Sequence, residues 1–148
     1  MSNSYLLSIF IMVMSRFYSQ FVCSNNPEFS IIIEDDGKVA YAYMINDNKI
    51  IADVWLYNCK AAPTVTKWDK NKMPFLNPME FLDTSRHATR IRKAEDVSID
   101  WKNINDNKLI EATISVNNGV LAKLLPGARP GWSAIVSKDG PLANKMAR

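Results

Sequence analysis

The chain has 148 residues, of which 47% are hydrophobic and 22% are charged. This length allows one domain with a core of its own, and the composition excludes a disordered or fibrous protein. The net charge of +3 is unevenly distributed, with −2 over residues 1–84 and +5 over residues 85–148. Such a spread is typical of a solvated surface, although it would also suit an anionic partner.

The chain contains two cysteines, Cys23 and Cys59, with no CxxC spacing. A secreted domain held together by disulfides needs more cysteines than this. We interpret both as reduced thiols, with Cys59 half-buried at the end of a strand, and we expect a cytoplasmic protein. A single bridge between them stays open as an alternative, because a sequence does not show whether two cysteines lie within bonding reach.

The N-terminus carries a short apolar run over residues 5–13. It is shorter than the roughly 20 apolar residues of a membrane-spanning helix, so integral membrane insertion is not expected. Three interpretations are open: an extension preceding a true start near Met14, a secretory signal over residues 1–24 that would make the protein exported, or a part of the fold. We assign residues 1–28 to an N-terminal extension and residues 29–148 to a single β-rich domain.

From residue 29 onward, apolar and polar residues alternate with period two, which predicts half-buried strands. Two tight turns rich in Asp, Asn and Gly separate the first three runs, and Gly37 supplies the positive φ that the first turn needs. The pattern predicts an antiparallel meander with strands over residues 29–34, 38–45 and 49–57. Both faces of the last two strands are apolar, so we expect a covered, central position for them.

A second meander is predicted in the C-terminal half. Residues 103–107 form one Asn/Asp-rich turn, and Asn117-Asn118-Gly119 contains an Asn-Gly pair that suits a type I′ hairpin. The strands of this meander run over residues 97–102, 110–116 and 120–124.

Between the two meanders, residues 59–77 lack periodicity and are expected to cross the surface. A helix of about two turns is predicted after them, because Asn77 can cap it, Pro78 suits the first helical position and Glu80 completes a capping box. After the Pro/Gly bend at residues 126–131, residues 132–136 suit either a short helix or a strand, and we favour a helical turn.

The predicted fold is therefore mainly β with minor α. It comprises antiparallel meander sheets of about six strands, arranged as a sandwich or as one curved sheet, with one or two short helices.

A catalytic constellation is not evident. His87 is the only histidine, and its candidate partners Cys59 and Ser85 lack a nucleophile motif. No glycine-rich phosphate loop is present, and the cysteines match no zinc spacing. Asp35-Asp36 and Asp47 could offer oxygen ligands to calcium, but we interpret them as turn residues. We expect no catalytic residue, no metal and no cofactor, and we keep His87 as a binding candidate.

Two further places carry binding candidates. Asp53 is an acidic residue within an apolar and aromatic strand, beside Trp55, where burial would raise the pKa of an unpaired carboxyl group. In the Pro/Gly-rich bend that follows residue 125, Arg129 and Trp132 are of the side-chain types enriched at protein-interface hot spots. The alternative is that Trp132 is part of the core and that the bend only reverses the chain.

A basic run extends over residues 86–93 and could contact phosphates. Glu95 and Asp96 follow at once and no aromatic residue interrupts the run, which favours a solvated edge strand protected by charge. Nucleic acid is therefore not the expected partner.

These observations favour a non-enzymatic protein-binding module, of the kind of bacterial immunity proteins that block one toxin, with an unknown protein as its partner. The alternative is a small enzyme or small-ligand binder, with a pocket between the aromatic strand face and the C-terminal bend. That alternative predicts an enclosed pocket containing Asp53 or His87.

Overall fold

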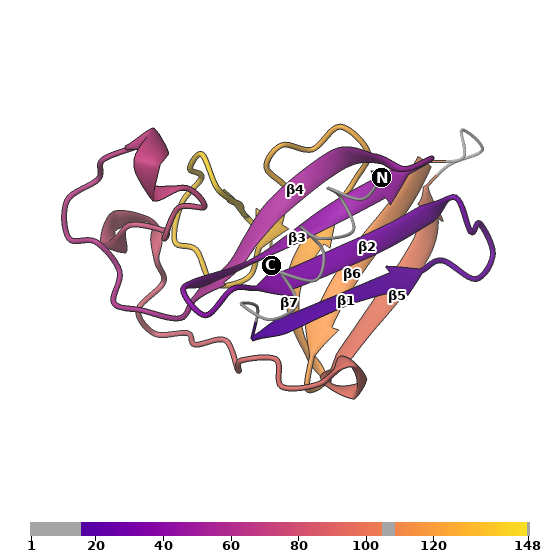
Figure 1. The fold of residues 1–148 in the computed structure, drawn as a ribbon, viewed down its shortest axis with the longest axis horizontal. Helices are drawn as coiled ribbons and strands as arrows, with labels where there is room; N and C mark the ends of the chain where they lie inside the picture. The colour runs from indigo at the N-terminus through magenta and orange to yellow at the C-terminus, as the bar shows by residue number, and fades with distance from the viewer. Residues whose placement is uncertain (1–15, 105–108, 148) are drawn as a thin grey trace, which may run out of the picture.

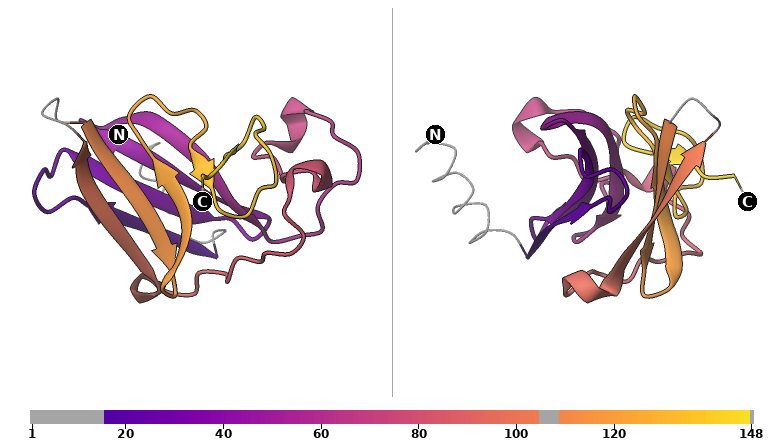
Figure 2. Two further views of the ribbon diagram at one scale, coloured as in Figure 1. Left: turned by 180° about the vertical axis from the view of Figure 1, so that it is seen from behind. Right: turned by 90° about the vertical axis from the view of Figure 1, so that its right-hand side faces the viewer.

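The computed structural model describes residues 16–104 and 109–147 of the chain. In it, two β-sheets lie face to face as two layers (Figures 1 and 2). One sheet has four strands in the order β1-β2-β3-β4, and the other has five in the order β5-β6-β7-β8-β9. The prediction of a mainly β protein is confirmed. Of the two predicted arrangements, a sandwich and one curved sheet, the two layers correspond to the sandwich.

The four-stranded sheet is an antiparallel meander whose strands are β1 (Phe17–Val22), β2 (Phe29–Asp35), β3 (Val39–Asn46) and β4 (Lys49–Asn58). Its three C-terminal strands are the first three predicted ones. Positive φ angles occur where the turn chemistry requires them, with 90° at Gly37, 51° at Asp47 and 65° at Asn48. Asn46 pairs with Lys49, so the last turn is a two-residue hairpin.

Strand β1 was not predicted, because residues 1–28 were left out of the fold. Its six residues pair with β2 from Phe17 opposite Asp35 to Val22 opposite Ser30. Both faces of the strand carry apolar side chains, so period-two alternation was hidden in the sequence. The apolar run over residues 5–13 lies outside the described residues.

The five-stranded sheet contains the second predicted meander, formed by β5 (Val97–Ile104), β6 (Leu109–Val116) and β7 (Gly119–Leu124). The β6–β7 turn is centred on Asn117 and Asn118, whose φ angles are 51° and 70°, so Gly119 already belongs to β7. Residues 105–108 of the other predicted turn lie outside the described residues.

The favoured helical turn over residues 132–136 is wrong, and the alternative, a strand, forms at the start of this stretch. Two short strands extend the sheet instead: β8 (Trp132–Ser133) pairs antiparallel with β7, and β9 (Asn144–Lys145) pairs parallel with β8. Pairing with β7 and β9 satisfies backbone groups that a helical turn would have bonded locally. The result is a sheet edge built from residues that are distant in the sequence.

The predicted two-turn helix is also wrong, because only a single 3₁₀ turn, η2 (Met79–Phe81), forms there. The main-chain N–H of Asn77 donates to Asn58 Oδ1 at 2.8 Å, and Asn58 Nδ2 donates to the carbonyl oxygen of Asn77 at 2.9 Å. Glu80 accepts from Lys138 Nζ at 2.8 Å instead of reaching back to a cap. Tertiary contacts therefore occupy the groups that the capping box needed.

Two other 3₁₀ turns, η1 (Lys70–Lys72) and η3 (Ala94–Asp96), complete the helical content of the described residues. Within residues 16–104 and 109–147, no helix has the length and apolar character needed to cross a membrane.

One hydrophobic core fills the space between the two sheets. Each sheet contributes residues with no exposed surface, and β4 contacts both β7 and β8. Fully enclosed members of the core include Ile31, Ile33, Met44, Val54, Leu56, Ala112, Ile114 and Leu124.

The outer edge of β4 is closed by the C-terminal bend and by Leu142. The N–H of Asp53 donates to the carbonyl oxygen of Ala128 at 3.1 Å, and the N–H of Gly131 donates back to the carbonyl oxygen of Asp53 at 2.8 Å. The N–H of Trp55 donates to the carbonyl oxygen of Leu142 at 3.0 Å. These bonds satisfy backbone groups that a free edge strand would expose.

Candidate functional site

Asp53 and Arg129 lie close enough for their charges to interact, because the C-terminal bend that carries Arg129 pairs with the edge of β4 at Asp53. The guanidinium of Arg129 donates to the carbonyl oxygen of Ile50. Burial raises the pKa of the half-buried Asp53 carboxyl above its usual value, and the charge of Arg129 opposes that rise only in part. The Arg129 side chain is therefore used to attach the bend to β4.

Trp132 begins β8, in the other sheet. It is half-buried, and the ammonium group of Lys123 sits 5.4 Å from the centre of its ring. Arg129 and Trp132 are thus each engaged by neighbouring residues of the chain. The predicted joint display of these two side chains for a partner is a hypothesis that this geometry does not favour.

Trp55 is buried in the core rather than placed on an aromatic outer face beside Asp53. A register shift between Ala40 and Tyr41 puts one extra residue into β4, and four consecutive residues of this strand, 54–57, are buried. The indole Nε1 of Trp55 donates to Asn58 Oδ1 at 2.9 Å. Alternation in the sequence could not reveal this irregularity.

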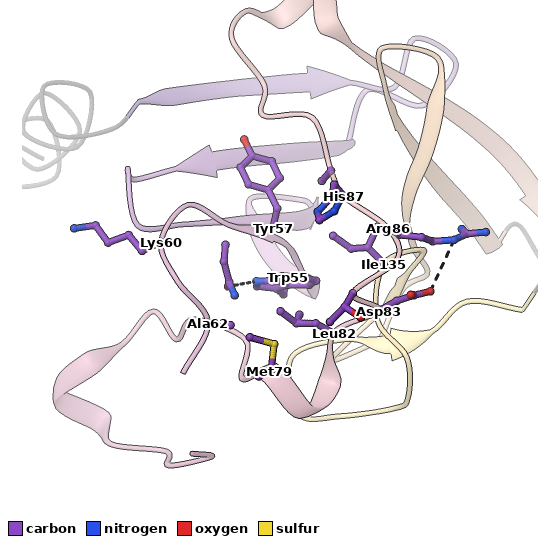
Figure 3. A pocket seen from close by; sticks show the side chains of 13 residues that line it. Trp55, Tyr57, Lys60, Ala62, Met79, Leu82, Asp83, Arg86, His87 and Ile135 are labelled. Atoms are coloured by element: carbon purple, nitrogen blue, oxygen red, sulfur yellow. Dashed lines mark hydrogen bonds and ion pairs between the residues drawn. The ribbon is translucent and has the colours of Figure 1, made fainter. Parts of the chain in front are cut away.

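One edge of Trp55 lines a pocket at the end of β4, with a volume of about 320 Å³ (Figure 3). His87 lines the same pocket, whereas Asp53 does not. The pocket opens to solvent between β4, η2 and the segment after it. Its apolar lining consists of Trp55, Ala62, Met79, Leu82, Ala88 and Ile135.

The walls of this pocket are held by backbone pairing between distant segments. Leu82 forms an isolated antiparallel bridge with Val136, and the N–H of Asp83 donates to the carbonyl oxygen of Ile135 at 2.9 Å. Asn58 holds the Trp55 indole and the Asn77 backbone at once. The pocket is therefore a preformed feature of the fold.

Charged side chains stand around the mouth of the pocket. Lys60 and Arg86 lie on opposite sides of it in Figure 3, and the exposed His87 lies between them. Asp83 accepts from the N–H of Ser85 at 3.1 Å and from its hydroxyl at 2.6 Å. Arg86 Nε lies 3.9 Å from Asp83 Oδ2. Both cations are side chains that the sequence analysis did not single out as candidates here.

The candidate partners of His87 are bonded elsewhere. Ser85 donates its hydroxyl to Asp83, and the Cys59 thiol donates to Asp35 Oδ1 at 3.3 Å. Burial and the Asp35 carboxylate raise the pKa of Cys59 to about 12, so the group is a thiol at neutral pH. A thiol is a weak nucleophile compared with a thiolate. The two cysteines are free, and Cys59 is half-buried just after β4, as predicted.

A buried carboxylate, Asp35, is the most heavily bonded side chain of the described residues. It has no exposed surface, and it accepts from the N–H of Gly37 at 2.8 Å and from the Tyr57 hydroxyl at 2.9 Å. Arg90 Nη2 donates to both carboxylate oxygens at 3.2 Å. Cys59 is its fourth partner. The sequence analysis interpreted Asp35 as a turn residue and missed this cluster, whose only signal was an Asp at the end of a strand.

Burial of Asp35 raises its pKa, but the hydrogen bonds and the charge of Arg90 together outweigh that effect and hold the pKa below its usual value. The carboxylate therefore stays ionised at neutral pH. Asp35 ends β2 opposite Ala40, near the start of β3, whereas Asp47 follows the last residue of β3, so the calcium set considered in the sequence does not assemble. Across residues 16–104 and 109–147, no group of three His, Cys, Asp or Glu side chains is arranged to hold a metal ion.

The basic run over residues 86–93 is not an edge strand, because it has no strand pairing. Arg90 is used by Asp35, and Arg86 lies beside Asp83. The N–H groups of Arg92 and Lys93 donate to Asp96. The run thus divides into residues with different local roles rather than forming one basic stripe.

Residues 60–79, which we call the projecting segment, extend beyond the ends of the strands (Figure 1). Four of the eight large hydrophobic side chains that are exposed in the described residues belong to this segment. The segment also carries four lysines and one acidic residue. The four exposed hydrophobic side chains, which we call the apolar cluster, are Val65, Trp68, Met73 and Met79.

The projecting segment is irregular but braced. The Tyr41 hydroxyl donates to the carbonyl oxygen of Phe75 at 2.6 Å, and Lys38 Nζ donates to that of Lys72 at 2.9 Å. Trp68 packs edge-on against Phe75, with ring centres 5.3 Å apart. These contacts confirm the prediction that residues 59–77 cross the surface without periodic structure.

Comparisons with known proteins found no matching family model, no matching curated protein and no matching solved structure.

Proposed function

We propose that this chain is a non-enzymatic protein-binding module, of the inhibitor or immunity kind, and that it contacts one protein partner through the projecting segment. The single observation that carries the proposal is the concentration of exposed Val, Trp and Met side chains on a braced, lysine-rich segment at one end of the molecule. Aromatic residues and methionine are enriched at protein interfaces, and hot spots cluster on a few such anchors.

Bracing matters for the affinity of such a contact. Binding by a flexible loop costs roughly 0.5–1.5 kcal/mol for each long side chain that becomes ordered, in addition to the ordering of its backbone. The bonds from Tyr41 and Lys38 to the segment hold its backbone before any partner arrives. A segment longer than about 15 residues without regular structure is uncommon in a compact domain unless it is functional.

The chemistry of the segment specifies the partner. Lys60, Lys67, Lys70 and Lys72 belong to the same segment as the apolar cluster, and Asp69 accepts from the N–H of Asn71 within η1. A complementary surface would be acidic at its rim and apolar at its centre. Opposite charges at the rim mainly raise the association rate, so binding is expected to slow as salt is added.

The experiment is affinity capture with the immobilised chain from a lysate of the native organism, followed by measurement of the affinity for the captured protein. The expected result is one near-stoichiometric partner whose dissociation constant rises at least tenfold with Val65→Ser or Met73→Ser. The matched control is Val120→Ser, because Val120 is also an exposed valine but lies on β7, away from the segment.

Each variant is first checked by thermal unfolding, since substitution of an exposed side chain is expected to leave stability nearly unchanged. Full affinity in both Val65→Ser and Met73→Ser would overturn the proposed surface. If affinity is instead lost with Arg129→Ala or Trp132→Ala alone, the contact is made by the C-terminal bend and β8. Failure to retain any protein specifically would count against the protein-binding function itself.

A further inference from the structure

We propose that the pocket at the end of β4 binds a small organic anion with an apolar body, such as an arylacetate. The inference goes beyond the proposed protein-binding function. Met79 and Lys60 belong both to the pocket and to the projecting segment, whereas Val65, Trp68 and Met73 do not line the pocket. It rests on the cavity, on the character of its walls and on the charges around its mouth.

The size and preorganisation of the pocket suit a small molecule. Its volume of about 320 Å³ lies near the lower end of the roughly 300–1,000 Å³ range of ligand pockets. Bridges between residues 82–83 and 135–136 fix one wall, and the bond from Trp55 to Asn58 fixes another. A ligand would therefore enter a site whose shape is already set.

The walls select an apolar body. The indole edge of Trp55 and the side chains of Leu82, Ile135 and Met79 line the pocket. The indole N–H of Trp55 is already used by Asn58, so the indole contributes an apolar surface and no free donor. A flat ring fits such a surface, because aromatic and aliphatic groups gain by packing against it.

The mouth selects an anion. Lys60 and Arg86 lie on opposite sides of it, and Asp83 is the one acidic lining residue that the described structure shows. Asp83 already accepts two hydrogen bonds from Ser85 and lies beside Arg86 at 3.9 Å, a loose pair at the surface. Arg86 Nη1 also donates to the carbonyl oxygen of Ala134 at 3.3 Å. Exposed ion pairs contribute little to stability, so Arg86 can exchange these two exposed contacts for a ligand carboxylate. Both cations attract a ligand carboxylate at the mouth and repel an amine there.

The experiment titrates the full chain with three matched probes: 1-naphthylacetate, 1-naphthylacetamide and 1-naphthylmethylamine. Binding is followed by two-dimensional ¹H–¹⁵N NMR, in which the Trp55 indole N–H reports directly from the pocket wall. We expect the acetate to bind at least fivefold more tightly than the neutral amide, and the amine to bind most weakly. The shifted resonances should include Trp55 and the backbone of residues 82–88.

Two kinds of variant test separately the charges at the mouth of the pocket and the space inside it. Lys60→Gln and Arg86→Gln should each reduce the acetate-to-amide affinity ratio at least twofold, with the amide affinity unchanged. The matched control is Arg92→Gln, from the same basic run but outside the pocket. Ala88→Leu fills the cavity and should weaken the acetate and the amide alike, with folding checked by thermal unfolding.

Equal affinities of acetate and amide for the unaltered chain would overturn the selection of an anion. Shifts confined to residues outside the pocket would overturn the site. Neither result bears on capture of a protein by the projecting segment, which is measured separately through Val65→Ser and Met73→Ser.

Discussion

At the scale of single residues, Asp35 is the side chain on which most of the local structure depends. Its carboxylate joins the end of β2 to the end of β4 through Tyr57 and to the 90–91 segment through Arg90. The Tyr57 hydroxyl in turn accepts from the N–H of Ile91 at 3.1 Å. A buried charge is tolerated only when it is paired and hydrogen-bonded, and Asp35 meets both conditions.

We expect Asp35→Asn to lower the free energy of unfolding by about 3 kcal/mol at pH 7, because it removes the charge that Arg90 pairs with and sets amide hydrogens against existing donors. Urea denaturation measures the change. The matched control is Asp100→Asn on β5, an exposed residue, whose substitution should cost less than about 0.5 kcal/mol. Equal stabilities of the two variants would show that the Asp35 cluster contributes little.

The same comparison has a defined pH dependence. The pKa of Asp35 is lowered in the folded protein, so its carboxylate keeps its charge at a pH where the unfolded chain, with a pKa of about 3.9, takes up a proton. The stability that this charge contributes is complete above about pH 4 and is lost as the pH falls through the lower folded value. The difference between the unaltered chain and Asp35→Asn should therefore shrink below pH 4. A difference that stays constant down to pH 2.5 would contradict this account.

At the scale of elements, the C-terminal bend is the segment that completes both sheets. It closes the edge of β4 and then leads into β8, which adds to β7. Gly131 lies where these two roles meet. A Cβ atom at this position would lie 2.5 Å from the carbonyl oxygen of Lys123 and 2.7 Å from Leu124 Cδ2. The close approach of backbone to backbone is possible because glycine has no side chain.

We expect Gly131→Ala to destabilise the protein by about 2 kcal/mol, because the methyl group can be accommodated only by moving β7 or the bend. The matched control is Gly119→Ala, whose Cβ would lie an ordinary 3.6 Å from its nearest neighbour, the carbonyl oxygen of Val116. Midpoints of urea unfolding compare the two. A Gly131→Ala variant as stable as Gly119→Ala would show that the bend moves freely.

The strands also show how far the alternation of residues and the turn residues in the sequence predict secondary structure. The six strands in the two meanders were predictable, because alternation and turn residues are properties of neighbouring positions. Strand β1 and the two-residue strands β8 and β9 were not, since their pairing depends on partners elsewhere in the chain. The capping box before Met79 failed for the same reason, because Asn58 and Lys138 engage the residues that would have formed it.

At the scale of the whole molecule, the two sheets share one core and should unfold together. Leu124 on β7 is fully buried among residues from both layers. Leu124→Ala should cost about 3 kcal/mol and shift the unfolding of both sheets equally. Far-UV circular dichroism and tryptophan fluorescence should give one common midpoint in urea. Val120→Ala, at an exposed position of the same strand, is the control, and two separate transitions would contradict a shared core.

The candidate site was predictable only in part. His87 and Trp55 were singled out in the sequence and do lie in one pocket, but Asp53 lies outside it with Arg129, and Trp132 lies on β8. Lys60 and Arg86 reach the pocket from separate segments of the chain. No spacing in the sequence relates such residues, because their proximity results from how the two sheets and their connections pack.

The sequence by itself determined the mainly β class, the six meander strands and the turns at Gly37, Asp47-Asn48 and Asn117-Asn118, because these depend on side-chain periodicity and on local backbone preferences. Only the tertiary structure decided that Asp35 is buried, that the C-terminal bend closes β4, and that a pocket forms beside Trp55. These features depend on contacts between residues distant in the chain, which satisfy backbone and charged groups that local structure leaves unpaired.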